Sequence, residues 1–148
     1  MYRHISETWE NNLKERTSVI KEYAVSWRKE PAILRIDKPT RLDRARRLGF
    51  KAKQGFIMVR IRVSRGGMRK SRPKAGRRPK HLGVVRIKAS VGMQEVAARR
   101  VQKKFPNMKV INSYLVYRDG KNQWFECILA DRDHPSIKAD SDLAYLSA

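Results

Sequence analysis

The stretch FIMVRIRV, residues 56–63, has the clearest strand pattern in the chain. Alternate side chains of a strand point to opposite faces, so the pattern separates an aliphatic face from a mixed one. We expect the aliphatic face to contact a core. The mixed face is either solvated or turned toward nucleic acid, and the basic sequence around it favours nucleic acid. The aliphatic face consists of Ile57, Val59, Ile61 and Val63, and the mixed face of Phe56, Met58, Arg60 and Arg62.

Two further segments, 109–117 and 123–130, are rich in β-branched and aromatic residues. They are separated by RDGKN, in which Asp119-Gly120 is a strong signal for a hairpin turn. The pattern predicts an antiparallel hairpin. Cys127 lies in the middle of its second strand and is interpreted as a small core residue.

Helical periodicity appears in two segments of the chain. From about residue 6 to 29, apolar positions recur at spacings of three and four, which predicts one long helix that Pro31 ends. Its tryptophans, Trp9 and Trp27, are interpreted as packing residues, with base stacking as the alternative. A second helix is predicted over about 93–105.

A short basic helix is predicted in RLDRARRLG, which starts at residue 41. We expect Thr40 to cap it with Asp43 in the capping-box position, and Gly49 to stop it in a left-handed conformation. Arginines would cover most of its surface, and their planar forks suit phosphates. The preceding run AILRI, residues 32–36, resembles a short strand.

These elements predict an α+β fold, in which a small antiparallel sheet carries packed helices, a long N-terminal helix and an extended basic loop. A length of 148 residues fits a single domain, residues 1–148, with a nucleic-acid-binding role suggested by its charge.

The formal net charge is +21, and it is concentrated in the middle of the chain. Residues 41–90 hold 18 basic residues and 1 acidic residue, whereas the segments before and after them carry +2 each. Such a balance points to a polyanionic partner. One cysteine, no signal-peptide pattern and no long apolar run predict a cytosolic protein that does not enter a membrane.

The most basic stretch, residues 64–83, contains eight Lys or Arg and no carboxylate. It lies between the strand at 56–63 and a second strand-like run at 84–89, so it is predicted to be an extended loop. With three apolar side chains it cannot form a core, and we expect it to be disordered without RNA.

Catalytic chemistry has little support in the sequence. The three histidines are far apart, and no phosphate loop or zinc spacing is present. Asp131, Asp133 and His134 form one local cluster that a metal-dependent nuclease could use, but Asp and Pro at this place are typical of a turn. We predict no enzymatic activity, no cofactor, no metal and no small-molecule substrate.

The block DRARRLGFKAKQGFIMVRIRVSRGG, residues 43–67, closely resembles the signature of the fifteen-e family of large-subunit ribosomal proteins of archaea and eukaryotes. A second block, 110–137, is similar to the later hairpin of that family. The resemblance implies an α+β core seated on large-subunit ribosomal RNA beside neighbouring ribosomal proteins, without a catalytic role. Family members usually continue into a basic, glycine-rich tail, whereas the printed sequence ends at DLAYLSA, so no contact of such a tail is carried over.

The residues predicted to bind RNA fall into two groups. The resemblance assigns the family's basic motif to Arg41, Arg44, Arg46, Arg47, Lys51, Lys53, Arg60, Arg62 and Arg65. The composition of the loop adds Arg69, Lys70, Arg72, Lys74, Arg77, Arg78 and Lys80. A free-standing, non-specific RNA-binding protein or RNA chaperone is the alternative function.

Overall fold

The computed structural model describes residues 1–67, 74, 76 and 90–146. In chain order its elements are α1 (Tyr2–Glu15), α2 (Ser18–Lys29), β1 (Ile33–Ile36), α3 (Leu42–Arg47), β2 (Phe56–Ser64), α4 (Met93–Lys104), β3 (Lys109–Arg118), β4 (Asn122–Ala130), α5 (Pro135–Lys138) and the 3-10 helix η3 (Ser141–Leu146). The expected α+β class is confirmed. The second strand-like run, 84–89, and the predicted disorder of the basic loop lie outside the described residues.

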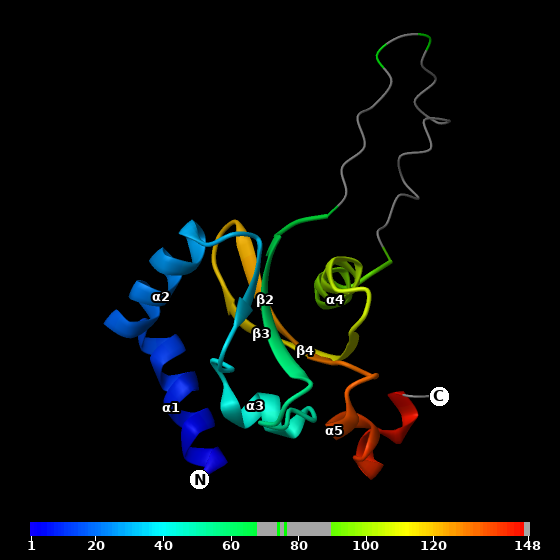
Figure 1. Cartoon of the computed structure of the whole chain (residues 1–148). Helices are drawn as coiled ribbons and strands as arrows, with labels where there is room; N and C mark the ends of the chain where they lie inside the picture. Colours follow the sequence, from blue (N-terminus) through cyan, green and yellow to red (C-terminus); the bar gives the residue numbers. More distant parts are fainter. Residues whose placement is uncertain (68–73, 75, 77–89, 147–148) are drawn as a thin grey trace.

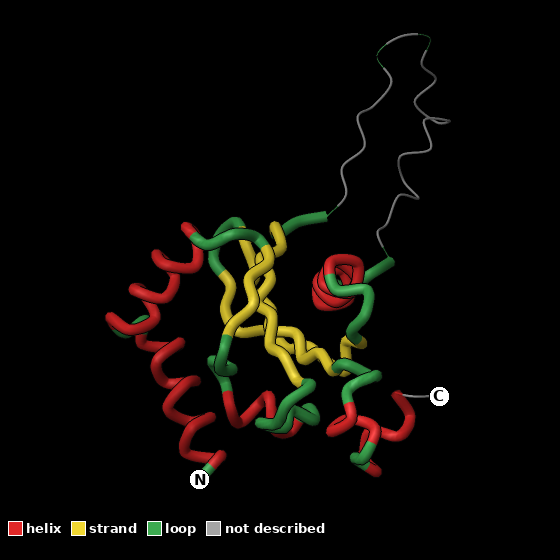
Figure 2. The backbone as a smooth tube through the Cα atoms, in the orientation of Figure 1, coloured by secondary structure: helices red, strands yellow, loops and turns green. Residues whose placement is uncertain are grey.

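A four-stranded sheet in the order β1-β2-β4-β3 forms the centre of the fold, and every neighbouring pair is antiparallel (Figures 1 and 2). The hairpin between β3 and β4 turns at Asp119, whose carboxylate accepts hydrogen bonds from the backbone N–H groups of Lys121 and Asn122. The predicted hairpin is confirmed. In β2, Val59 pairs with Cys127 of β4, and both side chains are fully buried.

The sheet separates two apolar layers. On one face, α4 packs through Ala97 and Val101 against the aliphatic residues of β2. On the other face, Trp27 of α2 and Ala45 of α3 pack on the sheet, and Figure 1 shows α1 and α2 on the side opposite α4. Because both faces are covered, the sheet and its buried side chains act as a rigid base for the short helix α3.

The N-terminal helix is broken, which corrects the prediction of one helix over about 6–29. Arg16 adopts a left-handed conformation with φ of 50°, and α2 starts again at Ser18. The N–H groups of Arg16 and Thr17 both bond to the carbonyl of Asn12, which closes α1. No glycine or proline marks this break, and the spacing of apolar residues continues across it. The sequence pattern therefore does not reveal that the helix ends here.

Helix α3 begins differently from the prediction. Arg41 is its N-cap residue, and no side chain caps its first turn. Thr40 does not cap α3, because its hydroxyl and its N–H both bond to Glu126 on β4. The predicted left-handed stop is confirmed, since Gly49 has φ of 97°.

The C-terminal helices close one end of the sheet. Ile137 of α5 and Leu143 of η3 pack on Ala130, the last residue of β4. Gly55 lies directly beneath Ile137 with φ of 88°, and a Cβ at this position would stand 2.6 Å from Ile137 Cγ1. A glycine is therefore required where the chain enters β2.

Candidate nucleic-acid interface

Helix α3 presents three exposed arginines, Arg44, Arg46 and Arg47. Among the described residues, none of the three has a salt-bridge or side-chain hydrogen-bond partner. Ala45, on the inner side of the same helix, is fully buried in the core. The helix is thus held by its inner side, and its guanidinium groups remain available to a ligand outside the protein.

Arg41 is used inside the protein. Its guanidinium donates to Asp43 at 2.9 Å and to the hydroxyl of Ser6 on α1 at 3.3 Å. Asp43 is 3% exposed. Burial alone would raise the pKa of this carboxyl, but the hydrogen bond and charge of Arg41 hold the pKa below its ordinary value. The hydrogen bond from Arg41 to Ser6 joins α1 to the start of α3.

A fully buried carboxylate, Glu126, fixes the segment before α3. It accepts hydrogen bonds from the N–H of Thr40 at 3.1 Å, from the hydroxyl of Thr40 at 2.5 Å and from the hydroxyl of Tyr114 at 2.5 Å. Burial, followed by the nearby charge of Glu126, raises the pKa of Tyr114 far above its ordinary value. Tyr114 therefore stays a hydrogen-bond donor at any physiological pH.

The mixed face of β2 is less open than expected, because α2 partly covers it: Met58 is buried, and Arg60 and Arg62 are half-buried. The side chain of Arg60 is 11% exposed and bonds to Glu30 at 3.2 Å and to Glu126 at 3.4 Å. Its guanidinium carbon lies 4.4 Å from the ring centroid of Trp27. Arg62 donates to the backbone carbonyl of Arg28 at 2.6 Å. Both arginines join β2 to α2.

Lys51 and Lys53 hold the C-terminal helices. The carboxylate of Asp140 lies 2.7 Å from Lys51 Nζ and 2.5 Å from Lys53 Nζ, and Asp142 lies 2.8 Å from Lys51. Hydrogen bonds from the two lysines lower the pKa of Asp140 to about 2. The carboxylates raise the pKa of Lys51 in return. These lysines remain at the surface, although each is paired with a carboxylate.

The basic loop is described at its first residues and at two isolated positions. Arg65 is exposed, and its guanidinium donates to the carbonyl of Asp119 at 2.7 Å, next to the hairpin turn. Lys74 is exposed as well. The remaining predicted loop residues, Arg69, Lys70, Arg72, Arg77, Arg78 and Lys80, lie outside the described residues.

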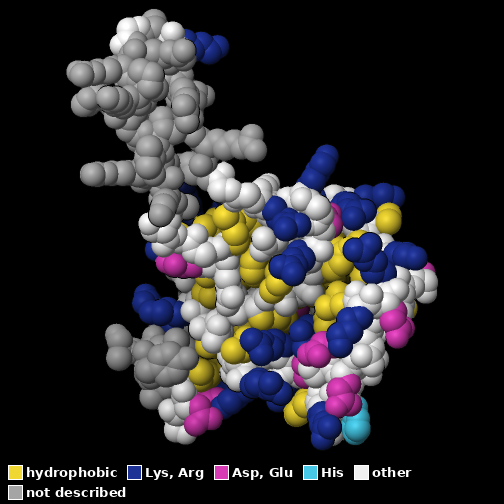
Figure 3. Space-filling model, turned by 180° about the vertical axis from the view of Figure 1, so that it is seen from behind, with side chains coloured by type: hydrophobic (Ala, Val, Ile, Leu, Met, Phe, Trp, Pro, Cys, Tyr) yellow, Lys and Arg dark blue, Asp and Glu magenta, His cyan; other side chains and the backbone are white. Residues whose placement is uncertain are grey.

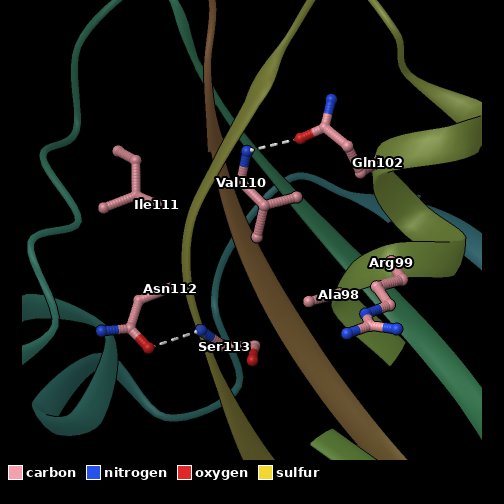
Figure 4. A pocket seen from close by; sticks show the side chains of 7 residues that line it. All are labelled: Ala98, Arg99, Gln102, Val110, Ile111, Asn112 and Ser113. Carbon is pink, nitrogen blue, oxygen red and sulfur yellow. Dashed lines mark hydrogen bonds between the residues drawn. The ribbon is translucent and has the colours of Figure 1, made fainter. Parts of the chain in front are cut away.

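Helix α4 faces away from α3 and has its own exposed cations, including Arg100 and Lys103. A shallow groove separates it from β3 (Figure 4). There Gln102 accepts from the N–H of Val110 at 3.1 Å and donates to the carbonyl of Met108 at 2.6 Å. The groove is therefore a packing seam in which one glutamine satisfies backbone groups near a bulge of β3.

The cluster Asp131, Asp133 and His134 forms a turn. The carboxylate of Asp131 accepts from the N–H of Asp133 at 3.0 Å, and Nδ1 of His134 accepts from the N–H of Ser136. Across the described part of the chain, no three His, Cys, Asp or Glu side chains are grouped to hold a metal ion.

The face of the molecule seen from behind the view of Figure 1 is also basic. Figure 3 shows Lys and Arg side chains spread over the visible face, with fewer Asp and Glu among them. None of the described helices has the length and apolarity needed to cross a membrane.

The model of one protein family, described as Ribosomal L15, matches residues 1–148. The chain belongs to the L15e family of ribosomal proteins. The match spans the whole printed sequence, including both blocks that carry the resemblance. Membership in this family makes the chain a structural protein of the large ribosomal subunit, a ribonucleoprotein component of the translation machinery. The family is one of structural rather than enzymatic proteins.

Sequence reasoning missed Glu126, the residue that positions the L15e chain's arginine-rich helix. The sequence of β4 could have indicated it. This strand reads NQWFECILA, and Glu126 is its one charged residue, among mainly apolar side chains. A lone charge in a strand that is buried on both faces needs an internal partner.

Proposed function

We propose that the chain binds and stabilises folded large-subunit ribosomal RNA through the exposed arginines of α3 and the basic loop at residues 64–83. The partners are this RNA and neighbouring ribosomal proteins, and the place of action is the cytoplasmic ribosome. The observation that carries the proposal is a set of three exposed arginines, unpaired within the described residues, on a helix that the buried Glu126 holds in one orientation.

The geometry favours recognition of shape over simple attraction. An arginine fork can bind a phosphate through two parallel hydrogen bonds, and it loses less entropy when its helix is already fixed. Arg44, Arg46 and Arg47 project from a helix of six residues, so their guanidinium groups can reach several neighbouring phosphates. A flexible basic tail would lack this arrangement.

The predicted RNA-binding residues therefore separate into two roles. In this proposal, RNA is contacted by Arg44, Arg46 and Arg47 of α3 and by the cations of the basic loop. Arg65 contacts RNA with the part of its exposed side chain that is not used by the hydrogen bond to Asp119. Five others support the interface by internal pairing, namely Arg41, Lys51, Lys53, Arg60 and Arg62.

The selectivity of the protein for ribosomal RNA over bulk RNA tests the proposed function. Competition binding should be measured at about 150 mM salt, with labelled large-subunit ribosomal RNA against unlabelled large-subunit RNA or bulk RNA, because charge attraction alone is weakened there. We expect bulk RNA to compete far less well than the ribosomal RNA. Equal competition by both would favour the free-standing, non-specific RNA-binding protein or chaperone and would contradict the proposal.

A further inference from the structure

Helix α1 and the start of α3 enclose a pocket of about 330 Å³. His4, Thr8, Trp9 and Asn12 line it from one face of α1, and Arg41 and Asp43 line the opposite wall. Its lining combines a large aromatic ring, an amide, a guanidinium and a carboxylate. These are the groups with which proteins stack on and hydrogen-bond to unpaired RNA bases.

Three polar atoms of the lining residues are buried and have no hydrogen-bond partner in the part of the chain that the structure describes. They are the indole Nε1 of Trp9, the Nε of Arg41 and the Oδ1 of Asp43. The first two are donors and the third is an acceptor. Because buried polar groups are nearly always paired, three such atoms around one pocket indicate that a polar group from outside the chain completes it.

Helix α1 is able to adjust to such a group. None of its residues is buried, and it is held at its inner face by the half-buried side chains of Ile5 and Trp9. A small displacement of α1 would open the pocket wall, and most of the main core, against which Trp9 packs, would stay covered by α2 and α3.

We propose that this pocket takes one unstacked nucleobase of the bound RNA, an inference that rests on the proposed RNA-binding function. The edge of the base accepts from Trp9 Nε1 and Arg41 Nε and donates to Asp43 Oδ1. The amide of Asn12 offers one more donor and acceptor. The exposed arginines of α3 follow directly along the chain, so the phosphates beside the base can be bound by the same short segment.

Replacement of Trp9 by phenylalanine gives the sharpest test, since W9F keeps an aromatic ring and removes the unpaired N–H. In the free protein W9F should fold like the wild type and lose only the packing of the smaller ring, because the lost donor has no partner among the described residues. Its affinity for purified large-subunit ribosomal RNA should fall about threefold to tenfold, as expected for one lost hydrogen bond. The slope of affinity against salt should not change, because no phosphate contact is removed.

Asn12 and Asn11 provide a matched pair on the same helix. Asn12 lines the pocket, whereas Asn11 is exposed outside it. We expect N12A to lower the RNA affinity about threefold to tenfold with the same salt slope, and N11A to leave the affinity unchanged. The two variants change helix propensity equally, so a general effect on α1 would move both.

A pocket that holds water alone gives the opposite pattern, in which both W9F and N12A bind RNA like the wild type. This result overturns the base pocket. If the wild-type protein does not distinguish ribosomal from bulk RNA, the proposed function itself fails, and this outcome is recognised before any variant is compared.

Discussion

Thr40 donates both its backbone N–H and its hydroxyl to the carboxylate of Glu126, across 86 residues of sequence. The carboxylate is fully buried on β4, and Thr40 immediately precedes the N-cap residue of α3. This double hydrogen bond ties the arginine-rich helix to the centre of the sheet. The orientation of the proposed RNA-binding arginines therefore depends on a residue that has no contact with RNA.

Removal of the Glu126 carboxylate should destabilise the fold strongly. E126A leaves the hydroxyl of Tyr114 and the N–H of Thr40 without an acceptor and takes a partner from the buried Arg60, so we expect a loss of about 3 to 5 kcal/mol in the free energy of unfolding. Urea denaturation of the full chain measures it. The matched control is E95A, which breaks an exposed pair with Arg99; it should cost about 0 to 1 kcal/mol. Equal losses in the two variants would show that Glu126 is not a structural anchor.

The arginines of α3 should account for a distinct part of the salt dependence of RNA binding. Each phosphate contact contributes about 0.7 to 0.9 to the slope of log affinity against log salt, so R44A/R46A/R47A should reduce the slope by about 2 to 3. The melting temperature should stay the same, because the three side chains are exposed and unpaired within the described residues.

The control for this triple variant is K14A/K21A/K29A, which removes the same charge from exposed positions on α1 and α2. Filter binding to large-subunit ribosomal RNA over a range of salt concentrations compares the two. We expect a slope close to that of the wild type in the control. If both triple variants reduce the slope equally, the protein attracts RNA by net charge and α3 is not a special surface.

The ion pairs of Lys51 and Lys53 with Asp140 should weaken at acidic pH. The pKa of Asp140 is about 2 in the folded protein against an ordinary 3.8, so the ionised form is favoured by folding. The stabilisation is complete above about pH 5 and is lost as the pH falls toward the folded pKa. Amide protection factors in α5 should therefore decrease over this range before those of β4.

D140N should lower the protection of α5 already at neutral pH and remove most of its acid dependence. The control is D133N, because the Asp133 carboxylate is exposed and lies 3.6 Å from Lys138 and outside the cluster. An acid response of α5 that is the same in D140N and in the wild type would assign it to another group.

Gly55 should not tolerate a side chain. An alanine there would adopt an unfavourable positive φ and place its Cβ against the buried Ile137, so G55A should cost about 2 to 4 kcal/mol. G66A serves as the control, since Gly66 has φ of 103° but no atom of the described residues within 4 Å of the place where a Cβ would stand. There, strain alone should cost about 1 kcal/mol. Thermal unfolding compares them, and similar costs would mean that contact with Ile137 does not matter.

Local patterns in the sequence predicted the local parts of the fold. β2 and the hairpin of β3 and β4 followed from alternation and from the turn at Asp119, and α4 followed from helical spacing. The break at Arg16 was missed because the apolar spacing continues through it. Its conformation lets Trp9 of α1 and Trp27 of α2 both pack on the core while α1 contacts α3, and local spacing does not encode these tertiary contacts.

The site was predicted less completely than the fold, for a related reason. Sequence reasoning treated every cation of the motif as available to RNA. Arg60 and Lys51 instead pair with Glu126 and Asp140, which are far away in the chain. Such pairs arise from tertiary contacts. The register of β2 and β4, which places Arg60 opposite Glu126, would have revealed the first pair.

Crosslinking of the protein to RNA inside assembled large ribosomal subunits, with mass spectrometry to find the crosslinked peptides, tests the central claim most directly. We predict that ribosomal RNA crosslinks to the peptides that carry Arg44, Arg46 and Arg47 and to residues 64–83, while peptides from the outer side of α2 around Lys21 are largely free of RNA. Crosslinks that lie on α2 and are absent from α3 would contradict the assignment of the RNA-binding surface.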